Sequence, residues 1–393
     1  MLPIGNNIFA KGFPFQWMYF DCQLSVTING QQLGTVVKIK TSNDAAKVGS
    51  TCELTVPLNS YLAYSDQNVL NQYLPAIRVD TFPQGCPVVI TAAYDGYPTL
   101  TVFKGFVYDF VLGMPATIKC MDYIYFFNLG IFGDKRVSTS NKSGKITDTG
   151  TGVNYKSVRF KDLLQQLIDF VNVTIASSTT GAEPVTLMLP TIDMTLVNLT
   201  FISMSPAAIL EWFKEQMGFN ITFYDNKLYV NLATQTNGLI NLNTGVNVHG
   251  SKLQTTLQQS ITVDNSTTST TYQSAFQRIR LKCWFVREDG TRDSLEIGDP
   301  NGIQEEHYFY KIRRNGNNYE TMANAALLKA QQHHYKGELD LYLYPDCDLF
   351  YRVNYIDLRY PEKNGVYVIT GVYLELDEKG FHRKIKVAWL AAS

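Results

Sequence analysis

The chain has 393 residues and a formal net charge of -1, with 34 Lys and Arg against 35 Asp and Glu. This balance excludes a general electrostatic attraction of the surface to nucleic acid or to an anionic membrane. The length predicts roughly two to four domains, and the 24 Tyr and 22 Phe favour strands and broad protein contacts.

No segment has the long apolar run of a membrane span, and residues 1–20 lack the pattern of a secretion signal. We therefore expect a soluble product that is made in the cytoplasm. The cysteines are scattered and include no Cys-x-x-Cys pair, which favours buried thiols over disulfides or a zinc site. These cysteines are Cys22, Cys52, Cys86, Cys120, Cys283 and Cys347.

Short antiparallel strands are predicted in the first third of the chain. In residues 22–40, alternating apolar residues flank Asn29-Gly30, which is typical of a two-residue hairpin turn. Two further strands are predicted at 52–56 and 87–94. Residues 1–135 are therefore expected to form a first antiparallel β-barrel of roughly six strands, with an N-terminal arm.

Residues 136–152 contain mostly Ser, Thr, Gly, Asn and Lys, and they predict a linker or exposed loop. Apolar residues then recur at helical spacing up to Val171, with Ser157 as the expected N-cap.

A second helix is marked more sharply, by Ser205 as the cap, Pro206 at the first helical position and Gly218 as the stop. A short hairpin over 219–232 follows it. Residues 153–233 are thus predicted to form a small α/β insert domain.

Residues 234–272 are polar and predict either an extended connecting segment or strands on an exposed edge. A hairpin is expected over 276–297 and a helix over 319–334. Residues 273–393 are predicted to form a second β-barrel with this helix packed against it. The predicted fold class is mainly β with an α/β insert: two similar antiparallel barrels separated by a small helix-containing domain.

The sequence of residues 102–120 is similar to that of residues 368–387, which suggests a duplicated hairpin. The alignment places Gly105 on Gly371 and Lys119 on Lys386. Each hairpin is expected to bury one apolar face and to carry an ion pair on the other. The predicted opposite residues are Phe110 and Ile118, Tyr108 and Cys120, Asp109 and Lys119 in the first copy, and Leu376 and Ile385, Leu374 and Val387, Glu375 and Lys386 in the second.

Catalytic signatures for nucleophilic hydrolases, zinc proteases, phosphate loops and dinucleotide sites are absent from the sequence. His333-His334 could be imagined as a metal site with Asp346 and Asp348, but adjacent helical histidines diverge by about 100°. Glu305-Glu306-His307 reads as a solvated loop. Two short basic clusters, Lys311–Arg314 and Arg383–Lys386, read as solvated faces. We expect no enzyme activity, cofactor, metal or nucleic-acid partner.

The order of barrel, helical insert, helix and second barrel resembles the phage tail baseplate hub family. This family includes late control D proteins, hubs of contractile tails and relatives at the tip of long non-contractile tails. The resemblance covers most of the chain. It departs from the family at Pro345-Asp-Cys-Asp, where relatives have a Pro-Gly-Asp-like step. The residues that carry it are Val102–Asp109, Ile118–Asp122, the Ser205-Pro206 helix, the Ala-rich helix over 322–330, and Gly365–Tyr373.

The resemblance implies two similar barrels side by side in each subunit and three subunits in a ring. Six barrels would then meet a sixfold tail tube on one side, while a threefold spike or tail tip meets the other. The implied partners are two further chains of this protein, the tail tube protein and the spike or tip protein, with the tape-measure protein as a further candidate. The implied location is the virion tail. Asp109, Lys119, Glu375 and Lys386 are candidates for lining the conduit or for contacts between barrels.

Two other functions compete with this one. A carbohydrate-binding adhesin of a phage tail or cell surface is the main alternative, because rings on Tyr-rich strands can stack on sugars. A tail-associated wall hydrolase is a third, although no remaining segment is large enough for an appended enzyme.

Overall fold

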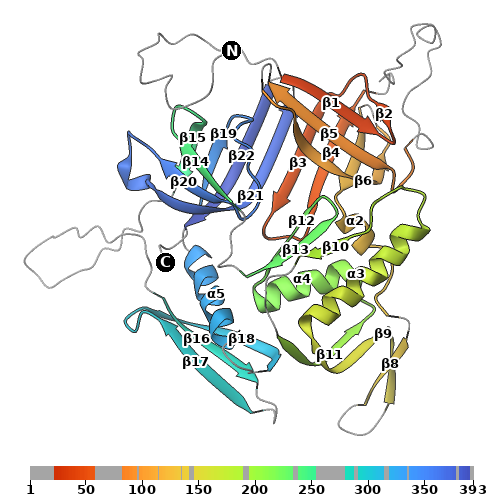
Figure 1. The fold of residues 1–393 in the computed structure, drawn as a ribbon, viewed down its shortest axis with the longest axis vertical. Coiled ribbons are helices and arrows are strands. Elements are labelled where there is room, and N and C mark those ends of the chain that lie inside the picture. The colour runs from red at the N-terminus through yellow and green to blue at the C-terminus, as the bar shows by residue number, and fades with distance from the viewer. Residues whose placement is uncertain are drawn as a thin grey trace, which may run out of the picture.

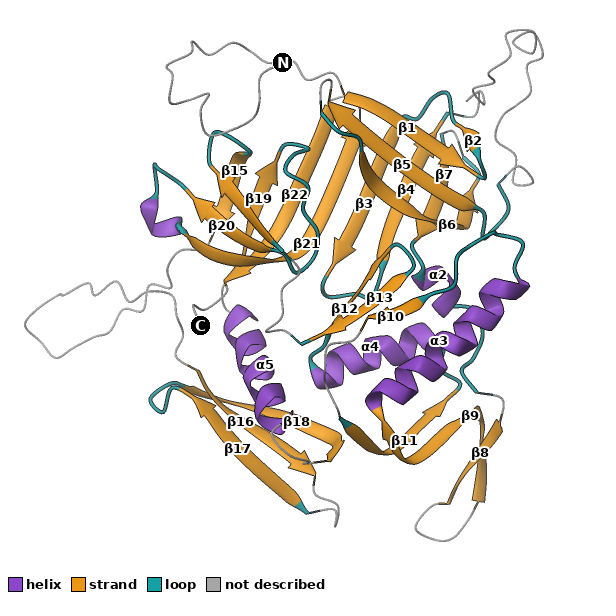
Figure 2. Cartoon of the chain, in the orientation of Figure 1, coloured by secondary structure: helices purple, strands orange, loops and turns teal. Residues whose placement is uncertain are grey.

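The computed structural model describes residues 22–57, 82–94, 97–113, 115–133, 135–140, 146–188, 194–232, 238–253, 279–286, 291–313, 318–333, 336–377 and 380–389. Within these ranges the fold is mainly β, as predicted, with sheets of thirteen, six and three strands. The thirteen-stranded sheet curls across the top of the molecule, and the helices and smaller sheets lie below it (Figures 1 and 2).

Antiparallel strands from the first third of the chain form what we call the N-terminal module. Their order across the sheet is β3-β4-β7-β6-β5-β1-β2. Asn29 and Gly30 have φ of 52° and 75°, which confirms the predicted turn. The module consists of β1 (Cys22–Ile28), β2 (Gln31–Gln32), β3 (Lys38–Asp44), β4 (Ser50–Val56), β5 (Pro87–Tyr94), β6 (Leu100–Val111) and β7 (Ala116–Met121).

The C-terminal module contains the last strands of the chain together with two strands from the polar segment 234–272. In the described part of that segment the second alternative applies, because β14 pairs with β20 and β15 pairs with β19, while residues 254–272 lie outside the described ranges. The module consists of β14 (Leu239–Asn243), β15 (Val248–Leu253), β19 (Lys336–Leu341), β20 (Arg352–Ile356), β21 (Gly365–Asp377) and β22 (Gly380–Trp389), with the 3-10 turn η2 (Pro361–Lys363) between β20 and β21.

The two modules have the same strand order. Across the sheet, β1-β5-β6-β7-β4-β3 corresponds to β14-β20-β21-β22-β19-β15, and the strands also follow one another along the chain in matching sequence. One difference is that β1 is antiparallel to β5, whereas β14 is parallel to β20. Closure of each module into a barrel stays a prediction, because the two modules share one continuous sheet.

The correspondence extends to single residues. A β-bulge separates Val107 from Asp109 opposite β7, and a second one separates Ile369 from Gly371 opposite β22. Lys119 faces Asp109 as Lys386 faces Gly371, so the bulges lie at equivalent places. A row of Lys-Glu-Lys crosses three strands in each module, as Lys40-Glu53-Lys119 and as Lys252-Glu338-Lys386.

The predicted strand register is correct near the turn of the first hairpin (β6 and β7) and wrong in the second hairpin (β21 and β22). Phe110 lies opposite Ile118 and Asp109 opposite Lys119, as predicted, whereas Val107 takes the place of Tyr108 opposite Cys120 because of the bulge. In the second hairpin Leu376 faces Phe381, Leu374 faces Arg383 and Glu375 faces His382. The turn there lies between Asp377 and Gly380, shorter than the sequence alignment assumed, and this shifts every pair.

The insert between the modules contains helices together with strands of the three-stranded and the six-stranded sheet. The second predicted helix is confirmed: Ser205 caps it through a 3.2 Å bond from the Ala208 N–H, and Gly218 ends it with φ of 71°. Ser157 is not a cap, because it pairs with Val197. The elements are α2 (Ile124–Phe127), β8 (Lys135–Ser140), β9 (Ile146–Arg159), α3 (Phe160–Ser177), β10 (Thr186–Met188), β11 (Thr195–Ile202), α4 (Pro206–Met217), β12 (Asn220–Tyr224) and β13 (Lys227–Asn231).

Two segments pair differently from the sequence expectation. The predicted linker 136–152 contributes to the β8–β9 hairpin. Residues 279–313, expected in the second barrel, form β16 (Ile279–Val286), β17 (Arg292–Gly298) and β18 (Ile303–Arg313) in the six-stranded sheet β17-β16-β18-β11-β9-β8. Glu305-Glu306-His307 is therefore part of a strand, and α5 (Asn318–His333) packs between this sheet and β22 (Figure 2).

Candidate functional site

The junction between the modules is a continuous strand pairing. β20 pairs with β21 only up to Val368, and β3 of the N-terminal module takes over the same edge from Gly371 to Leu376. This antiparallel pairing joins residues more than 300 positions apart, since Asp44 faces Gly371. Backbone hydrogen bonds therefore fix the two modules against each other.

A row of alternating charges crosses this junction. Cross-strand partners lead from Glu375 through Lys40, Glu53 and Lys119 to Asp109, so each base lies between two acids. Lys119 Nζ lies 2.9 Å from Asp109 Oδ2, and Lys40 Nζ lies 4.0 Å from Glu375 Oε1. Opposite charges across strands favour this register and disfavour one shifted by a strand position.

Glu375 contacts the N-terminal module rather than its own hairpin. Its carboxylate forms an ion pair with Lys38, and that hydrogen bond holds the pKa of Glu375 below its usual range. Lys38 also lies 3.7 Å from Asp377. The predicted partner of Glu375, Lys386, lies in the second Lys-Glu-Lys row.

Lys386 reaches across the junction to Asp44. Its Nζ lies 3.2 Å from Asp44 Oδ2 and 2.7 Å from the Tyr373 hydroxyl, above whose ring it sits at 4.7 Å. Tyr373 donates a hydrogen bond to the same carboxylate. Burial acts to raise the pKa of Asp44, but the bonds from Tyr373, Ala46 N–H and Lys386 together lower it, so the carboxylate stays ionised.

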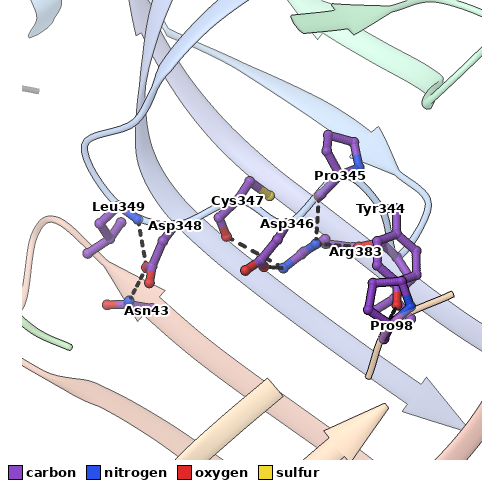
Figure 3. A network of polar contacts seen from close by, with 10 residues as sticks. Asn43, Pro98, Tyr344, Pro345, Asp346, Cys347, Asp348, Leu349 and Arg383 are labelled. Carbon is purple, nitrogen blue, oxygen red and sulfur yellow. Dashed lines mark hydrogen bonds and ion pairs between the residues drawn. The ribbon is translucent and has the colours of Figure 1, made fainter. Parts of the chain in front are cut away.

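Arg383 of β22 organises the loop that follows β19, as Figure 3 shows. Its side chain is only 7% exposed and donates to the carbonyl oxygens of Leu343 at 2.5 Å and Pro345 at 3.0 Å. It also contacts Asp346 Oδ1 at 3.2 Å. The Pro345-Asp-Cys-Asp step, where the sequence departs from the family pattern, is thus held by a buried cation.

Asp348 at the end of this step touches the N-terminal module. Its Oδ1 accepts hydrogen bonds from the Asn43 side chain at 3.1 Å and from the Leu349 N–H at 2.7 Å (Figure 3). Burial raises its pKa to about 6, against the opposing effect of these bonds. The hydrogen-bond partners described for Asp346 and Asp348 are Arg383, Asn43 and Leu349, and His334 lies outside the described part of the chain.

Apolar contacts complete the junction. Leu376 of β21 packs against the core of the N-terminal module, and Ala92 of β5 shares a cluster with Leu343. The rings of Tyr97 and Tyr344 lie 4.9 Å apart. The two modules therefore share buried surface as well as strand pairing.

A cavity of about 260 Å³ lies beside the junction, and its lining includes Asn43, Lys104, Asp122, Asp348 and Arg383. Burial raises the pKa of Asp122 to about 6, although the N–H groups of Ile124 and Ser50 donate to its carboxylate. Within the ranges that the structure describes, no group of three or more His, Cys, Asp or Glu is placed to hold a metal ion. No helix in these ranges is long and apolar enough to cross a membrane.

The structure brings three of the four sequence-predicted site residues together in one charged row, which holds Asp109, Lys119 and Glu375, and it places Lys386 in the equivalent row. Their side chains are between 31% and 44% exposed. Sequence reasoning missed several junction residues whose partners lie far along the chain: Lys38, Asn43, Asp44, Asp348, Tyr373 and Arg383. The two Lys-Glu-Lys rows gave no signal in the sequence, because their members are unevenly spaced along the chain, and the rows become visible only through the strand pairings.

Five cysteines, Cys52, Cys86, Cys120, Cys283 and Cys347, are free and buried, as predicted, while the side chain of Cys22 lies outside the described part of the chain. Burial raises the pKa of each of these five thiols, which makes them poor nucleophiles.

Two β-modules of one strand order, joined edge to edge and separated by an α/β insert, define the class of fold. No protein-family model and no curated protein matches the sequence. Solved structures do share the fold over nearly the whole chain. A tail protein from Neisseria meningitidis MC58 matches with a TM-score of 0.55 and 11% identity, over 94% of this chain and 96% of that one.

A 43 kDa tail protein of prophage MuSo2 from Shewanella oneidensis matches with a TM-score of 0.52 and 15% identity, over 94% of this chain and 98% of that one. A third match is an Escherichia coli component of the type VI secretion system, which is described as structurally similar to the T4 phage tail proteins gp27 and gp5. Its TM-score is 0.51 and its identity 8%, over 93% of this chain and 77% of that one. The chain therefore has the fold of phage tail proteins, as the sequence resemblance led us to expect.

Proposed function

We propose that this chain is a structural subunit of a phage tail, located in the virion, and that three copies form a hub. The hub joins a sixfold tail tube to a threefold spike or tail tip. The similarity of fold to tail proteins supports the tail assignment. The hub role rests on the duplication within the chain.

The observation that carries this proposal is the residue-level match of the modules. The same strand order, equivalent bulges and equivalent Lys-Glu-Lys rows make them near-equal units. Three chains with two such units each present six similar surfaces to a sixfold partner, while the inserts keep threefold symmetry. A single chain type can thereby connect two symmetries.

The charged rows supply a lining for the central conduit in this proposal. Asp109, Lys119, Glu375 and Lys386 alternate along the strands with buried neighbours such as Ile118 and Ile385, so they lie on the face opposite the module cores. Because charges of opposite sign alternate, this face has little net charge. Such a lining would bind a long charged polymer only weakly as it passes through the conduit.

The test is the mass of the purified protein, alone and mixed with the tail tube protein of the same phage. A trimer of 44.4 kDa chains, about 133 kDa, is expected. A strict monomer in both samples would contradict the hub role. A glycan array serves as the comparison, because discrete sugar binding together with no tube association would favour an adhesin instead, and zymography would detect any wall hydrolase.

A further inference from the structure

Helix α5 connects three parts of the molecule. Its apolar side packs into the largest core together with residues of β16. Further along the helix, Leu328 packs against Val368 and Ala388 of the C-terminal module. The next residue, Lys329, donates a hydrogen bond of 3.2 Å from its Nζ to the carbonyl oxygen of Phe219 in the insert. One helix therefore ties the strands β16, β17 and β18 to both the C-terminal module and the insert (Figure 2).

We call α5 together with β16, β17 and β18 the α5 unit. Among the described residues, its strand pairing to the insert consists of one residue pair, Leu196 of β11 with Ile312 of β18. At the other side of the α5 unit, β17 is the terminal strand of the six-stranded sheet. The seating of the α5 unit therefore depends mainly on side-chain contacts, and the contact between α4 and α5 is one of them.

A buried lysine of the insert lies at this contact without a partner. Lys214 of α4 is 7% exposed, and within the part of the chain that the structure describes its Nζ has no hydrogen-bond partner. Burying an amine in this way is costly, so it calls for an explanation. The Gly218 N–H donates to the Lys214 carbonyl oxygen, and Phe219 follows Gly218. Lys214 and Lys329 therefore approach the same end of α4, from within that helix and from α5.

Acidic groups face Lys214 from two elements. They are Glu211 and Glu215 of α4 and Asp44 of β3, and all three favour the ammonium form of Lys214. Glu211 accepts a hydrogen bond from the Val48 N–H at 2.5 Å, so its carboxylate is engaged elsewhere. Burial has the larger effect and lowers the pKa of Lys214 to about 8. Lys214 is therefore mostly charged at neutral pH.

Lys329 faces two bases. Burial, together with the charge of Lys214, lowers the pKa of Lys329 to about 7. From β18, His307 also faces Lys329, and burial and that lysine lower the pKa of the imidazole. Within the described residues, the His307 Nε2 is buried without a hydrogen-bond partner. Lys329 is thus the group at this contact whose charge changes near neutral pH, beside a lysine that is already charged.

We propose that the contact between α4 and α5 is a latch, which opens when Lys329 gains a proton beside the charged Lys214. With Lys329 neutral, its amine donates to the Phe219 carbonyl oxygen at the negative end of α4, and the α5 unit stays seated. With Lys329 charged, two ammonium groups repel each other where water is excluded, and the α5 unit moves until both are hydrated. The latch lies within one chain, so it does not depend on the hub role.

The direction of the pH effect follows from proton linkage. In the open form Lys329 has its ordinary pKa and is protonated throughout the neutral range, whereas the closed form must take up the proton as the pH falls through about 7. The closed form is therefore favoured at high pH and loses this advantage on acidification. From about pH 8 to about pH 6, the opening equilibrium should increase about tenfold through Lys329.

Hydrogen–deuterium exchange measures this opening on the intact chain. Peptides from α5 are compared at about pH 8 and about pH 6, after correction for the intrinsic pH dependence of exchange, and peptides from β4 and β7 are the internal reference. The amides of α5 should lose protection about tenfold on acidification, whereas those of β4 and β7 should not. An equal loss in both regions would mean that the whole fold is weakened, and it would overturn the latch.

Two substitutions of Lys329 separate a latch from a lysine with a structural role. Lys329→Arg keeps its charge at every pH, so α5 should already be unprotected at about pH 8 to the extent that the unchanged chain shows at about pH 6. Lys329→Met has no proton to gain, so α5 should stay protected at both pH values, apart from an effect of about twofold through Lys214. A structural role predicts the reverse order, with arginine tolerated and methionine disruptive, and that result overturns the proposal.

A substitution of Lys214 keeps the test open if the Lys329 variants do not fold. Lys214→Met removes the charge that opposes protonation of Lys329, so the loss of α5 protection on acidification should be clearly smaller than tenfold. An unchanged tenfold loss would contradict the proposed role of Lys214. The matched control is Lys384→Met, because Lys384 pairs with Glu338 at 3.2 Å on a half-exposed face and its loss should leave the pH response of α5 as it is.

Discussion

Replacing Arg383 with methionine should destabilise the protein by roughly 3 kcal/mol, because it removes donors from buried carbonyl oxygens. The guanidinium donates to Leu343 O at 2.5 Å and to Pro345 O at 3.0 Å. Each bond from a charged donor contributes about 1.5 kcal/mol or more. The contact with Asp346 adds little, since that carboxylate is 69% exposed.

Urea unfolding followed by circular dichroism measures this loss as a lower midpoint at unchanged slope. The neighbouring variant Lys384→Met is the control, because Lys384 pairs with Glu338 at 3.2 Å on a half-exposed face and its loss should cost less than about 1 kcal/mol. A loss below about 1 kcal/mol for Arg383→Met would refute the reasoning that this arginine organises the loop beside the junction.

Three further outcomes are expected. Burial and a neighbouring lysine lower the pKa of Lys329 to about 7 in the folded protein, so above pH 7 the unfolded chain binds more protons than the folded one. The free energy of unfolding should therefore rise from pH 7 to about 8.5. In denaturant titrations, Lys329→Met should flatten this rise. Gly105→Ala should cost about 2–3 kcal/mol in thermal unfolding, because a Cβ would lie 2.3 Å from the Met121 carbonyl oxygen. A double-mutant cycle of Asp44→Asn and Lys386→Met should give a coupling below about 1 kcal/mol that shrinks with added salt, because both side chains are partly solvated.

Each of these has a result that contradicts it. A Lys329→Met chain with the wild-type pH slope would mean that other groups set the slope. Gly238→Ala is the control, because Gly238 also lacks a positive φ and its Cβ would come no nearer than 3.4 Å to Tyr351; a loss as large as that of Gly105→Ala would remove the steric argument. A coupling energy between Asp44 and Lys386 that does not change with salt concentration would show that the pair is less solvated than its exposure indicates.

Local features of the fold could be predicted from the sequence. The helix from Pro206 to Met217 carries its own cap and stop, and the Asn29-Gly30 turn needs only the backbone freedom of two residues. The pair Asp109 and Lys119 followed from a short hairpin whose turn fixes its register. Such elements depend on residues that are neighbours along the chain.

The second hairpin shows why the rest could not be predicted. Its sequence was aligned on Gly371 and Gly105, but the structure places Gly371 opposite Lys386, at the position that Asp109 has in the first hairpin. A bulge and a shorter turn move the register without changing the alternation of apolar and polar residues. Periodicity reports which face is buried, not which residue is opposite.

The candidate site was the hardest part, because its residues pair across most of the chain. The residues near Asp44 in the sequence do not indicate that its ion-pair partner is Lys386. Those near Asn43 do not indicate its hydrogen bond to Asp348. The pairing of residues 279–313 with β11 is of the same kind. Long-range strand partners are chosen by the complete fold, after the local elements have formed.

The pairing of β3 with β21 also sets an order of events during synthesis. β3 is synthesised more than 300 residues before the strand that covers its edge, residues 371–376. Until then the nascent N-terminal half carries an exposed strand edge, which invites aggregation. Chains that stop before residue 371 should therefore be chaperone clients, because the edge of β3 stays uncovered until β21 has been made.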